Sequence, residues 1–388
     1  MAAHYQRPAD SAETSGEFPQ SPDPSLHERR ILVLHNRDFE ASGDANDLDV
    51  ISRADVETSA RDVARALCSR GHFVEVQGID SSDIHDLIKQ LRQDPPDLVF
   101  NLIESLGADS RHEILVPSLL DLLGVPYTGS PPLTLGLCGR KQHTKQILTG
   151  AGISTPPAAV LPAQPQPRAL DLQAVAHLQY PLFVKLAQED ASLGISAASI
   201  VNSDDELVRQ VAALRDKYRQ PLLVEKFIEG RELHVALLGS APMRTLPVQE
   251  LDFSTLPPGL PHIITYDSKW NRDSVEYHTR TERAGPMPKG LLEHVEQLAH
   301  RCFRSLEVSD YGRCDIRLAA DGTPYVIDVN PNCDLADGAG YARAGLLGGL
   351  TYDLLIEQIA ISALTRNAHA RAHRHHAHLD SPERAARP

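Results

Sequence analysis

Short apolar runs alternate with stretches of helical periodicity over the first third of the chain. The apolar runs of strand length are Ile31–His35, Phe73–Gln77 and Asp97–Leu102, and the stretches with helical spacing are Ser59–Ser69 and Glu113–Leu123. Gly71 and Gly124 directly follow the two helical stretches, where glycine commonly ends a helix. This order of elements predicts a parallel sheet with helices on its faces, closing near Gly139.

The rest of the chain mixes strands and helices without such a regular alternation. The predicted strands are Leu182–Lys185, Leu222–Glu225, Glu232–Leu238, Arg313–Leu318 and Tyr325–Val329, and the predicted helices are Asp204–Lys217 and Tyr352–Ala363. The proline-rich stretch Thr155–Pro167 is predicted as a surface connection. We therefore expect an α/β domain followed by an α+β region.

The two ends of the sequence lack apolar periodicity. Residues 1–28 are rich in Pro, Ser, Glu and Asp, and residues 367–388 carry a run of histidines among Arg and Ala, namely His373, His375, His376 and His378. We predict both ends as disordered tails. The histidines could bind a metal adventitiously, but no cysteine or carboxylate is spaced to close a site, which favours a solvated tail.

Composition narrows the classes of function. A chain of 388 residues is too long for one simple core, so we expect two or three domains. The formal net charge of -14 argues against a nucleic-acid-binding protein, although a local basic site for an anion such as ATP stays open. No apolar run approaches the ~20 residues that cross a bilayer, and no signal peptide is predicted. Five scattered cysteines without zinc-ligand spacing predict reduced thiols in a cytoplasmic protein.

A candidate metal site lies near the end of the sequence. Asp315, Asp328 and Asn330 lie on the strand-like segments CDIRL and YVIDVN, which the turn Asp321-Gly322 joins. A hairpin would place Asp315 beside Asp328, and Asp328 and Asn330 would share one face of their strand. Two carboxylates and an amide oxygen form an oxygen-only site that suits Mg²⁺. The alternative is that Asp328 and Asn330 merely end a strand.

Two further segments could bind a nucleotide. Lys185 ends the apolar run PLFVK before the small-residue loop QEDASLGIS, where a lysine can meet phosphate; the alternative is a strand-end lysine that reaches solvent. In VEKFIEGREL, residues 224–233, backbone groups can bind adenine and the Glu232 carboxylate can hold ribose hydroxyls; the alternative is a surface hairpin. Residues 136–141 read GLCGRK, which is not a Walker A motif, so ATP would need another architecture.

Taken together, these segments resemble the D-alanine–D-alanine ligase branch of the ATP-grasp superfamily over most of residues 30–362. The resemblance is carried, in this order, by FNLIES, GVPYTGS, GRKQHTKQIL, AGISTP, YPLFVKLAQEDASLGIS, LLVEKFIEGREL, YDSKW, YGRCDIRL, YVIDVNPN and GLTYDLLIEQI. It implies an ATP-grasp fold with an N-terminal parallel-sheet (pre-ATP-grasp) domain. The expected divisions are a disordered tail at 1–28, the N-terminal domain at 29–139, the ATP-grasp small lobe at 140–238, the C-terminal lobe at 239–366 and a disordered His-rich tail at 367–388.

The resemblance also assigns roles to individual residues. Phosphate contacts fall on Lys141 and Lys185, and the flap over the phosphates falls on Glu189 to Gly194, with Ser192 kept. The adenine strap falls on Glu225, Lys226 and Ile228, and the ribose carboxylate falls on Glu232. The lysine near the γ-phosphate falls on Lys269, the arginine that steadies an acyl phosphate on Arg313, and the metal ligands on Asp315, Asp328 and Asn330. These metal ligands agree with the hairpin argument above.

A reaction and its partners follow from those implied roles. The substrate carboxylate attacks the γ-phosphate of ATP, and an amine then converts the acyl phosphate into an amide. The cofactors are ATP and Mg²⁺, as one or two ions, for which Mn²⁺ can substitute. The partners are small-molecule carboxylate and amine substrates, amino acids or peptides, with no nucleic acid and no membrane. Family members are commonly dimers through the N-terminal domain, so a homodimer is expected.

The sequence departs from the family pattern where substrates bind. Asp328 stands where the family usually has glutamate, which is longer by one methylene. The glutamate that holds the first amino acid's ammonium falls on residues 53–55 (Arg-Ala-Asp), so it is absent unless Asp55 replaces it. Its serine and tyrosine partners appear as Ala191 and Trp270. The serine that helps to bind the second substrate's carboxylate falls near Ala339. Because polar groups that read an amino acid's charged ends give sharp specificity, losing them as a set predicts a different substrate pair; Trp270 alone could merely preserve packing.

The sequence therefore predicts an ATP-dependent carboxylate–amine ligase with an altered substrate pocket. One alternative is an authentic D-alanine–D-alanine ligase of peptidoglycan synthesis. The other is a non-catalytic nucleotide-binding protein that kept the ATP-grasp fold. The retained Lys269, Arg313 and metal ligands argue against this second alternative.

Overall fold

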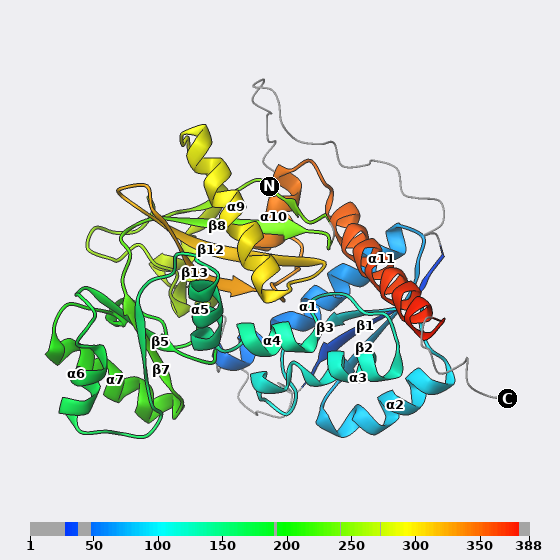
Figure 1. The fold of residues 1–388 in the computed structure, drawn as a ribbon, viewed down its shortest axis with the longest axis horizontal. Coiled ribbons are helices and arrows are strands. Elements are labelled where there is room, and N and C mark those ends of the chain that lie inside the picture. Colours follow the sequence, from blue (N-terminus) through cyan, green and yellow to red (C-terminus); the bar gives the residue numbers. More distant parts are fainter. Residues whose placement is uncertain (1–27, 38–47, 190–191, 241, 272, 380–388) are drawn as a thin grey trace.

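The computed structural model describes residues 28–37, 48–189, 192–240, 242–271 and 273–379, and three sheets organise this part of the chain (Figure 1). The first sheet is parallel and three-stranded. The second has four strands and the third has six, all paired antiparallel. The expected combination of an α/β domain with α+β lobes is confirmed.

The N-terminal unit is a sheet of order β2-β1-β3 between two helix layers. Its elements are β1 (Arg30–Asn36), α1 (Leu48–Ser69), β2 (Phe73–Ile79), α2 (Ile84–Gln93), β3 (Leu98–Leu102) and α3 (Leu115–Leu123), with α11 (Tyr352–Leu379) added from the end of the chain. Alternate side chains of β1 face opposite layers, as strand geometry requires. Ile31 and Val33 pack with α1 and α11, whereas Leu32 and Leu34 pack with α2 and α3. The predicted parallel sheet is confirmed, although α1 starts earlier than predicted.

The small lobe is a four-stranded sheet of order β4-β7-β5-β6 covered by two helices. Its elements are β4 (Ala158–Leu161), α6 (Arg168–Val175), β5 (Leu182–Leu186), β6 (Ile200–Val201), α7 (Asp204–Tyr218) and β7 (Leu222–Lys226). The prediction that Thr155–Pro167 is only a surface connection is wrong, because β4 lies inside it. The prolines flank β4 rather than interrupt it, and an edge strand tolerates proline at its ends.

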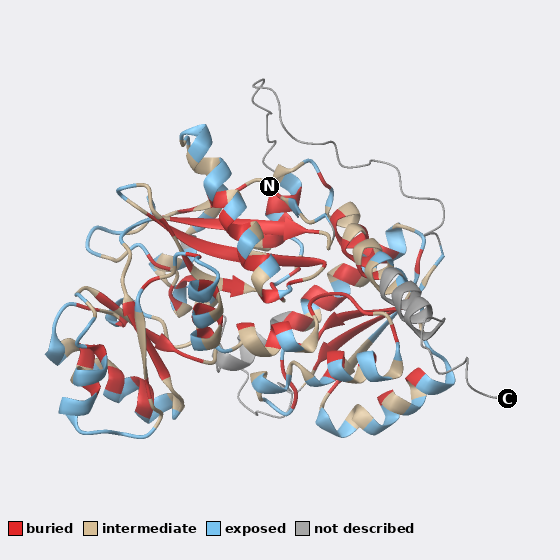
Figure 2. Ribbon diagram, viewed as in Figure 1, coloured by how far each residue is buried: buried red, intermediate tan, exposed pale blue. Residues whose placement is uncertain are grey.

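The large lobe is a six-stranded sheet of order β11-β10-β8-β12-β13, with β9 paired to β8. Its strands are β8 (Gly230–Leu238), β9 (Arg244–Thr245), β10 (Gln249–Asp252), β11 (Arg280–Arg283), β12 (Tyr311–Ala319) and β13 (Pro324–Asn330). Its helices are α4 (Pro132–Cys138), α5 (Lys141–Gly150), α8 (Tyr266–Trp270), α9 (Lys289–Leu306) and α10 (Gly340–Leu347). The core under α5 and α9 takes Leu233, Val235 and Leu237 from β8, and β8 and β12 are buried along most of their length (Figure 2).

The two lobes meet at the short segment between β7 and β8. A surface hairpin of these two strands was one alternative from the sequence. Instead, β7 pairs with β4 and β5, whereas β8 pairs with β12. The predicted lobe boundary after Leu238 is therefore too late, since β8 already belongs to the large sheet. At the change of sheet Gly230 has φ +141°, and a Cβ there would lie 2.0 Å from the carbonyl oxygen of Leu318, so only glycine fits.

The last helix is longer than predicted. It continues past Ala363 to Leu379, through part of the tail that we predicted as disordered, because Ala and Arg favour helix and no Gly or Pro interrupts them. The side chains of the histidine run, like residues 1–27 and 380–388, lie outside the described part of the structure. Within that part, no single helix is long and apolar enough to span a membrane. Taken together, α10 and α11 reach the required length and hydropathy, but the chain bends by 101° between them.

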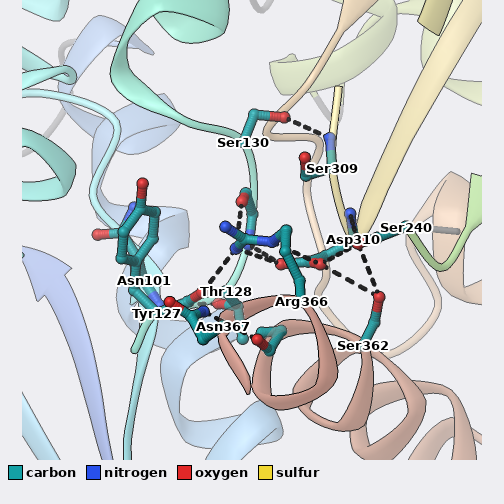
Figure 3. Close-up of polar contacts among 12 residues, drawn as sticks. Asn101, Tyr127, Thr128, Ser130, Ser240, Ser309, Asp310, Ser362, Arg366 and Asn367 are labelled. Carbon is teal, nitrogen blue, oxygen red and sulfur yellow. Dashed lines mark hydrogen bonds and ion pairs between the residues drawn. The ribbon is translucent and has the colours of Figure 1, made fainter. Parts of the chain in front are cut away.

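An ionic contact ties α11 to both the N-terminal unit and the large lobe (Figure 3). The guanidinium of Arg366 on α11 lies 2.8 Å from Asp310 Oδ2 and donates to the backbone oxygens of Tyr127 and Gly129. Asp310, which is fully buried before β12, also accepts hydrogen bonds from Ser240 and Ser362. Three parts of the fold thus share one buried carboxylate.

Replacing Arg366 by methionine is expected to lower the free energy of unfolding by about 3 kcal/mol, because the buried Asp310 carboxylate loses its cationic partner. Urea denaturation measures the change. Arg65→Met is the matched control, since Arg65 pairs with Asp337 on the surface with 56% of its side chain exposed. We expect that control to change stability by less than about 1 kcal/mol. Equal effects of the two substitutions would contradict a role for the buried contact.

Candidate active site

A cleft of about 1610 Å³ lies between the two lobes and the N-terminal unit. This exceeds the roughly 300–1,000 Å³ of a typical small-ligand pocket, so the cleft has room for a nucleotide and other small molecules together. The residues predicted to contact ATP, the acyl phosphate or the metal line this cleft: Lys141, Lys185, Glu189, Ser192, Glu225, Lys226, Ile228, Glu232, Lys269, Arg313, Asp315, Asp328 and Asn330. Their individual roles remain predictions.

Strand alternation explains why β12 contributes so many of these charges. Arg313, Asp315 and Arg317 point to the cleft side of the sheet, while the residues between them face the core under α9. On the neighbouring strand, Glu232 and His234 share the cleft face, with His234 opposite Asp315. The sheet therefore presents a row of charged groups to one side of the cleft.

The predicted β12–β13 hairpin is confirmed. Asp315 lies directly opposite Asp328, and the turn is closed by Gly322 in a left-handed conformation at φ +84°. A β-bulge follows this pair, so that Ile327 has no partner residue across the ladder. Its carbonyl oxygen instead accepts a hydrogen bond from Lys185 Nζ at 3.2 Å. The bulge thereby links the carboxylate pair to the small-lobe lysine.

A buried carboxylate joins two lysines at the back of the cleft. Glu225, which is 3% exposed, lies 2.8 Å from Lys185 Nζ through Oε1 and 2.7 Å from Lys145 Nζ through Oε2. Burial raises the pKa of Glu225, but the two ammonium groups outweigh burial and lower it. The sequence placed Glu225 only in the adenine strap. In the structure its carboxylate positions a lysine that the resemblance assigns to phosphate.

Lys145 is a residue that the sequence analysis missed. Burial lowers the pKa of its ammonium group, against the opposing effect of Glu225. Its Nζ also donates to Thr155 Oγ1 at 2.7 Å and to the Pro156 carbonyl oxygen at 3.1 Å. The signal that could have found it is its spacing from Lys141 on α5, because residues four apart lie on the same helix face.

The two carboxylates of the β12–β13 hairpin are also paired with cations. Lys141 Nζ lies 2.9 Å from Asp328 Oδ2. Arg313 donates two hydrogen bonds to Asp315, at 2.6 and 2.9 Å. Burial raises the pKa of Asp315, but the Arg313 charge, with His234 and Lys269, lowers it well below its usual range. The same balance of burial against Lys141 and Lys185 lowers the pKa of Asp328, so both carboxylates are ionised at neutral pH.

These carboxylates form a donor set that fits a hard divalent cation. Asp315 and Asp328 face each other across the hairpin, and Asn330, two residues after Asp328, also lines the cleft. The Asn330 amide oxygen accepts a hydrogen bond from the Asn332 backbone at 3.0 Å. No cluster of three or more His, Cys, Asp or Glu side chains suited to a metal occurs in the described residues. A cation here would therefore need phosphate or water to complete its shell, which is typical of Mg²⁺.

The predicted ribose carboxylate is held by an arginine. Glu232 Oε2 lies 2.8 Å from the guanidinium of Arg317, which stacks 5.3 Å from the centre of the Phe227 ring. Lys226 directs its ammonium away, to the Tyr180 carbonyl oxygen at 2.9 Å. Any contact of Lys226 with a nucleotide base would thus involve its backbone.

The flap is described at Glu189 and from Ser192 onward, while residues 190–191 lie outside the described part. Ser192 and Gly194 adopt left-handed conformations, at φ +62° and +73°. The Tyr266 backbone donates to the Ile195 carbonyl oxygen at 2.9 Å. Because Tyr266 opens α8, this bond couples the flap to the helix that carries Lys269 and Trp270.

The substrate end of the cleft is only partly described. The side chains of residues 53–55 and the whole of Ala191 fall outside the described residues, so their predicted substitutions stay predictions. Trp270 and Ala339 line the cleft as predicted. Ala339 precedes α10, whose first turn adds Arg343, a cleft residue that the sequence analysis did not single out.

Known proteins share this fold and these segments. A family model described as D-ala D-ala ligase C-terminus matches residues 147–361. A D-alanine–D-alanine ligase of Pseudomonas entomophila is 32% identical over 312 residues, which cover 78% of this chain and 87% of that protein. The chain belongs to the D-alanine–D-alanine ligase family.

Two further proteins are similar to this chain, one in sequence and one in fold. An uncharacterized protein of Sinorhizobium fredii, y4sG, is 31% identical over 272 residues, covering 68% of this chain and 76% of that protein. The crystal structure of the D-alanine–D-alanine ligase from Bacillus anthracis complexed with ATP has a TM-score of 0.67 and 22% identity, covering 89% of this chain and 99% of that chain. The protein is therefore an ATP-grasp ligase that uses ATP to form a C–N bond, and the non-catalytic alternative is not supported.

Proposed function

We propose that this ligase uses Mg²⁺ and ATP to convert a substrate carboxylate into an acyl phosphate, which it joins to the amine of a second amino acid or peptide. The observation that carries the proposal is the meeting of Lys141 and Lys185 with the facing carboxylates Asp315 and Asp328 in one cleft. Cations gathered beside a metal-binding carboxylate pair suit the transfer of a phosphoryl group, whose oxygens carry the charge.

Each group has a defined part in this proposal. Lys141, Lys185 and Lys269 supply positive charge to the phosphoryl oxygens. Bound by Asp315, Asp328 and Asn330, Mg²⁺ would supply further neutralisation of charge on those oxygens. Arg313 is oriented in advance by its two bonds to Asp315, so little reorganisation is needed when the acyl phosphate forms.

The chemical steps need no covalent bond to the protein. An oxygen of the substrate carboxylate forms a bond to the γ-phosphorus, and the bond to the bridging oxygen breaks to release ADP. The amine nitrogen then forms a bond to the acyl carbon. The tetrahedral intermediate collapses as the C–O bond to phosphate breaks, and the nitrogen loses a proton. The products are an amide, ADP and phosphate.

We propose that the substrate pair differs from two molecules of D-alanine. The support is that Trp270, Ala339 and Arg343 line the substrate end of the cleft. A second candidate is the joining of two D-alanines, and the names of the relatives favour it. The two candidates differ in the substrates that this cleft must bind.

Phosphate release from ATP with Mg²⁺, measured across pairs of amino acids of both configurations, tests the proposal. We expect release to be stimulated by at least about tenfold by a pair other than D-alanine with D-alanine. Stimulation by D-alanine alone, with a dipeptide formed, would favour the second candidate. An absence of stimulation across carboxylates and amines, in protein that binds ATP, would contradict ligase activity.

We further propose that the protein is a cytoplasmic homodimer. Phe73 and Val76 on the edge strand β2 are 65% and 42% exposed, which supports contact with another copy through the N-terminal unit. The cysteines of the described residues form no disulfide, which is consistent with a reducing compartment.

A further inference from the structure

Two arginines from separate elements meet at the substrate end of the cleft. Arg280 begins β11, and Arg343 lies in the first turn of α10; both line the cleft together with Arg313. The two elements are held side by side, because the Arg283 guanidinium donates to the Leu347 carbonyl oxygen at the end of α10, at 2.8 Å. The placement of Arg280 near Arg343 is thus fixed by the fold.

These two guanidinium groups are not neutralised as Arg313 is. Within the described part of the chain, no carboxylate lies within ion-pair distance, 4.0 Å, of Arg280 or Arg343. Burial lowers the pKa of Arg343, and Arg280 lowers it further, whereas Asp334 acts in the opposite direction. Asp334 is itself engaged, since its Oδ1 accepts hydrogen bonds from Ser59 Oγ and the Ala336 backbone. Two like charges held together over an open cleft are the arrangement that an anionic ligand stabilises.

We infer that Arg280 and Arg343 bind a second anionic group on the amine substrate, so that this substrate is an acidic amino acid or a phosphorylated one. The inference rests on the proposed function and specifies its substrate class. Arg343 lies three residues after Gly340, and a Cβ at Gly340 would lie 3.9 Å from Arg313 Nη1, so the start of α10 is close to Arg313.

In a simpler arrangement, Arg343 alone would bind one carboxylate of the substrate. It would then take the place of the serine that the family has near Ala339. A single carboxylate accepts two parallel hydrogen bonds from one guanidinium and is then filled on that side. Arg280 would remain without a counter-charge beside another cation. A second anionic group bound between the two arginines neutralises both, which is why the pair favours a doubly anionic substrate.

Ligand binding can be followed without turnover, because Trp270 is the single tryptophan of the chain and lines the cleft. We would titrate alanine, aspartate, glutamate and O-phosphoserine, each in both configurations, in the presence of Mg²⁺ and an ATP analogue that cannot transfer its phosphate. Quenching of Trp270 and calorimetry both report the affinity. We expect at least one acidic ligand to bind roughly ten- to hundredfold tighter than alanine. Comparing the dicarboxylates with O-phosphoserine tells which anionic group is preferred.

Arg343→Met and Arg280→Met are each expected to remove most of this preference while alanine binding changes by less than about threefold. Arg209→Met is the matched control, because Arg209 is exposed on α7 and does not line the cleft. Equal affinities for alanine and every acidic ligand, or an unchanged preference in both cleft variants, would overturn the inference. A loss of equal size for alanine and the acidic ligands would also overturn it, since it would show a single carboxylate on Arg343.

The same titration separates this inference from the proposed function. If acidic ligands bind preferentially but no phosphate is released from ATP with any partner, the specificity stands and the ligase proposal fails. If phosphate is released equally well with neutral and acidic amines, the ligase proposal stands and the doubly anionic substrate is wrong.

Discussion

Asp315→Asn is expected to abolish ATP turnover, with a loss larger than the ten- to hundredfold typical of removing an outer-shell partner of a metal ligand. The substitution keeps the size of the side chain and removes its negative charge. It weakens the cation site, because Asp328 would be the one remaining carboxylate of the hairpin pair. It also frees Arg313, which two hydrogen bonds now hold in place. Both effects act on the phosphoryl group, so they should compound.

Phosphate release measured against Mg²⁺ concentration distinguishes these two effects. A lost metal ligand raises the concentration of Mg²⁺ needed for half-maximal rate, whereas a displaced Arg313 lowers the rate at every concentration. Asp216→Asn is the control, since Asp216 is exposed on α7 outside the cleft. Normal turnover in Asp315→Asn would show that the metal assignment is wrong.

Glu225→Gln is expected to lower the free energy of unfolding by about 3–5 kcal/mol at neutral pH. The cause is the pair of buried ammonium groups, Lys145 and Lys185, which would lose the carboxylate between them. Affinity for ATP should fall as well, because Lys185 would no longer be held at its present position. Urea denaturation and quenching of Trp270 by ATP measure the two effects. Glu293→Gln, at an exposed pair with Lys289, should change stability by less than about 0.5 kcal/mol.

The effect of Glu225→Gln should also depend on pH. The pKa of Glu225 is lowered in the folded protein, so its ionised form stabilises the fold fully above the ordinary glutamate value of 4.5. That contribution is lost as the pH falls below 4.5 and through the lowered pKa. The difference in stability between the wild type and the variant should therefore be constant near neutral pH and shrink in acid. A difference that grows in acid would show that the carboxylate is not held ionised.

Local chemistry made much of this fold predictable. The Asp321-Gly322 turn fixes the register of its hairpin within a few residues, so the meeting of Asp315 and Asp328 followed from the sequence. The glycine turn before Glu232 looked much the same, yet its two strands pair in different sheets. A turn signal reports how the chain bends, whereas the partner of a strand is decided by residues far away in the sequence. This is why the lobe boundary was placed too late. The strand β4 was missed for a different reason, because the prolines that flank it are typical of a surface connection.

The candidate site shows the same division. The structure places the predicted ATP and metal residues in the cleft, because they lie in short motifs that carry their own local geometry. The partners of those residues were harder to foresee. Nothing in the sequence near Glu225 says that Lys145 will reach it, and Arg280 and Arg343 meet only because β11 lies along α10. Electrostatic pairing of this kind depends on packing between elements, which periodicity does not encode.

The position of α11 has a consequence for how the protein folds during synthesis. One face of the first sheet, with Ile31 and Val33, is covered partly by Ile356 and Ile359 of α11. Those residues leave the ribosome only after both lobes have been made. The first sheet to emerge is therefore among the last to be completed, and the part of its apolar face that α11 covers stays open to chaperones, or to wrong partners, through most of translation.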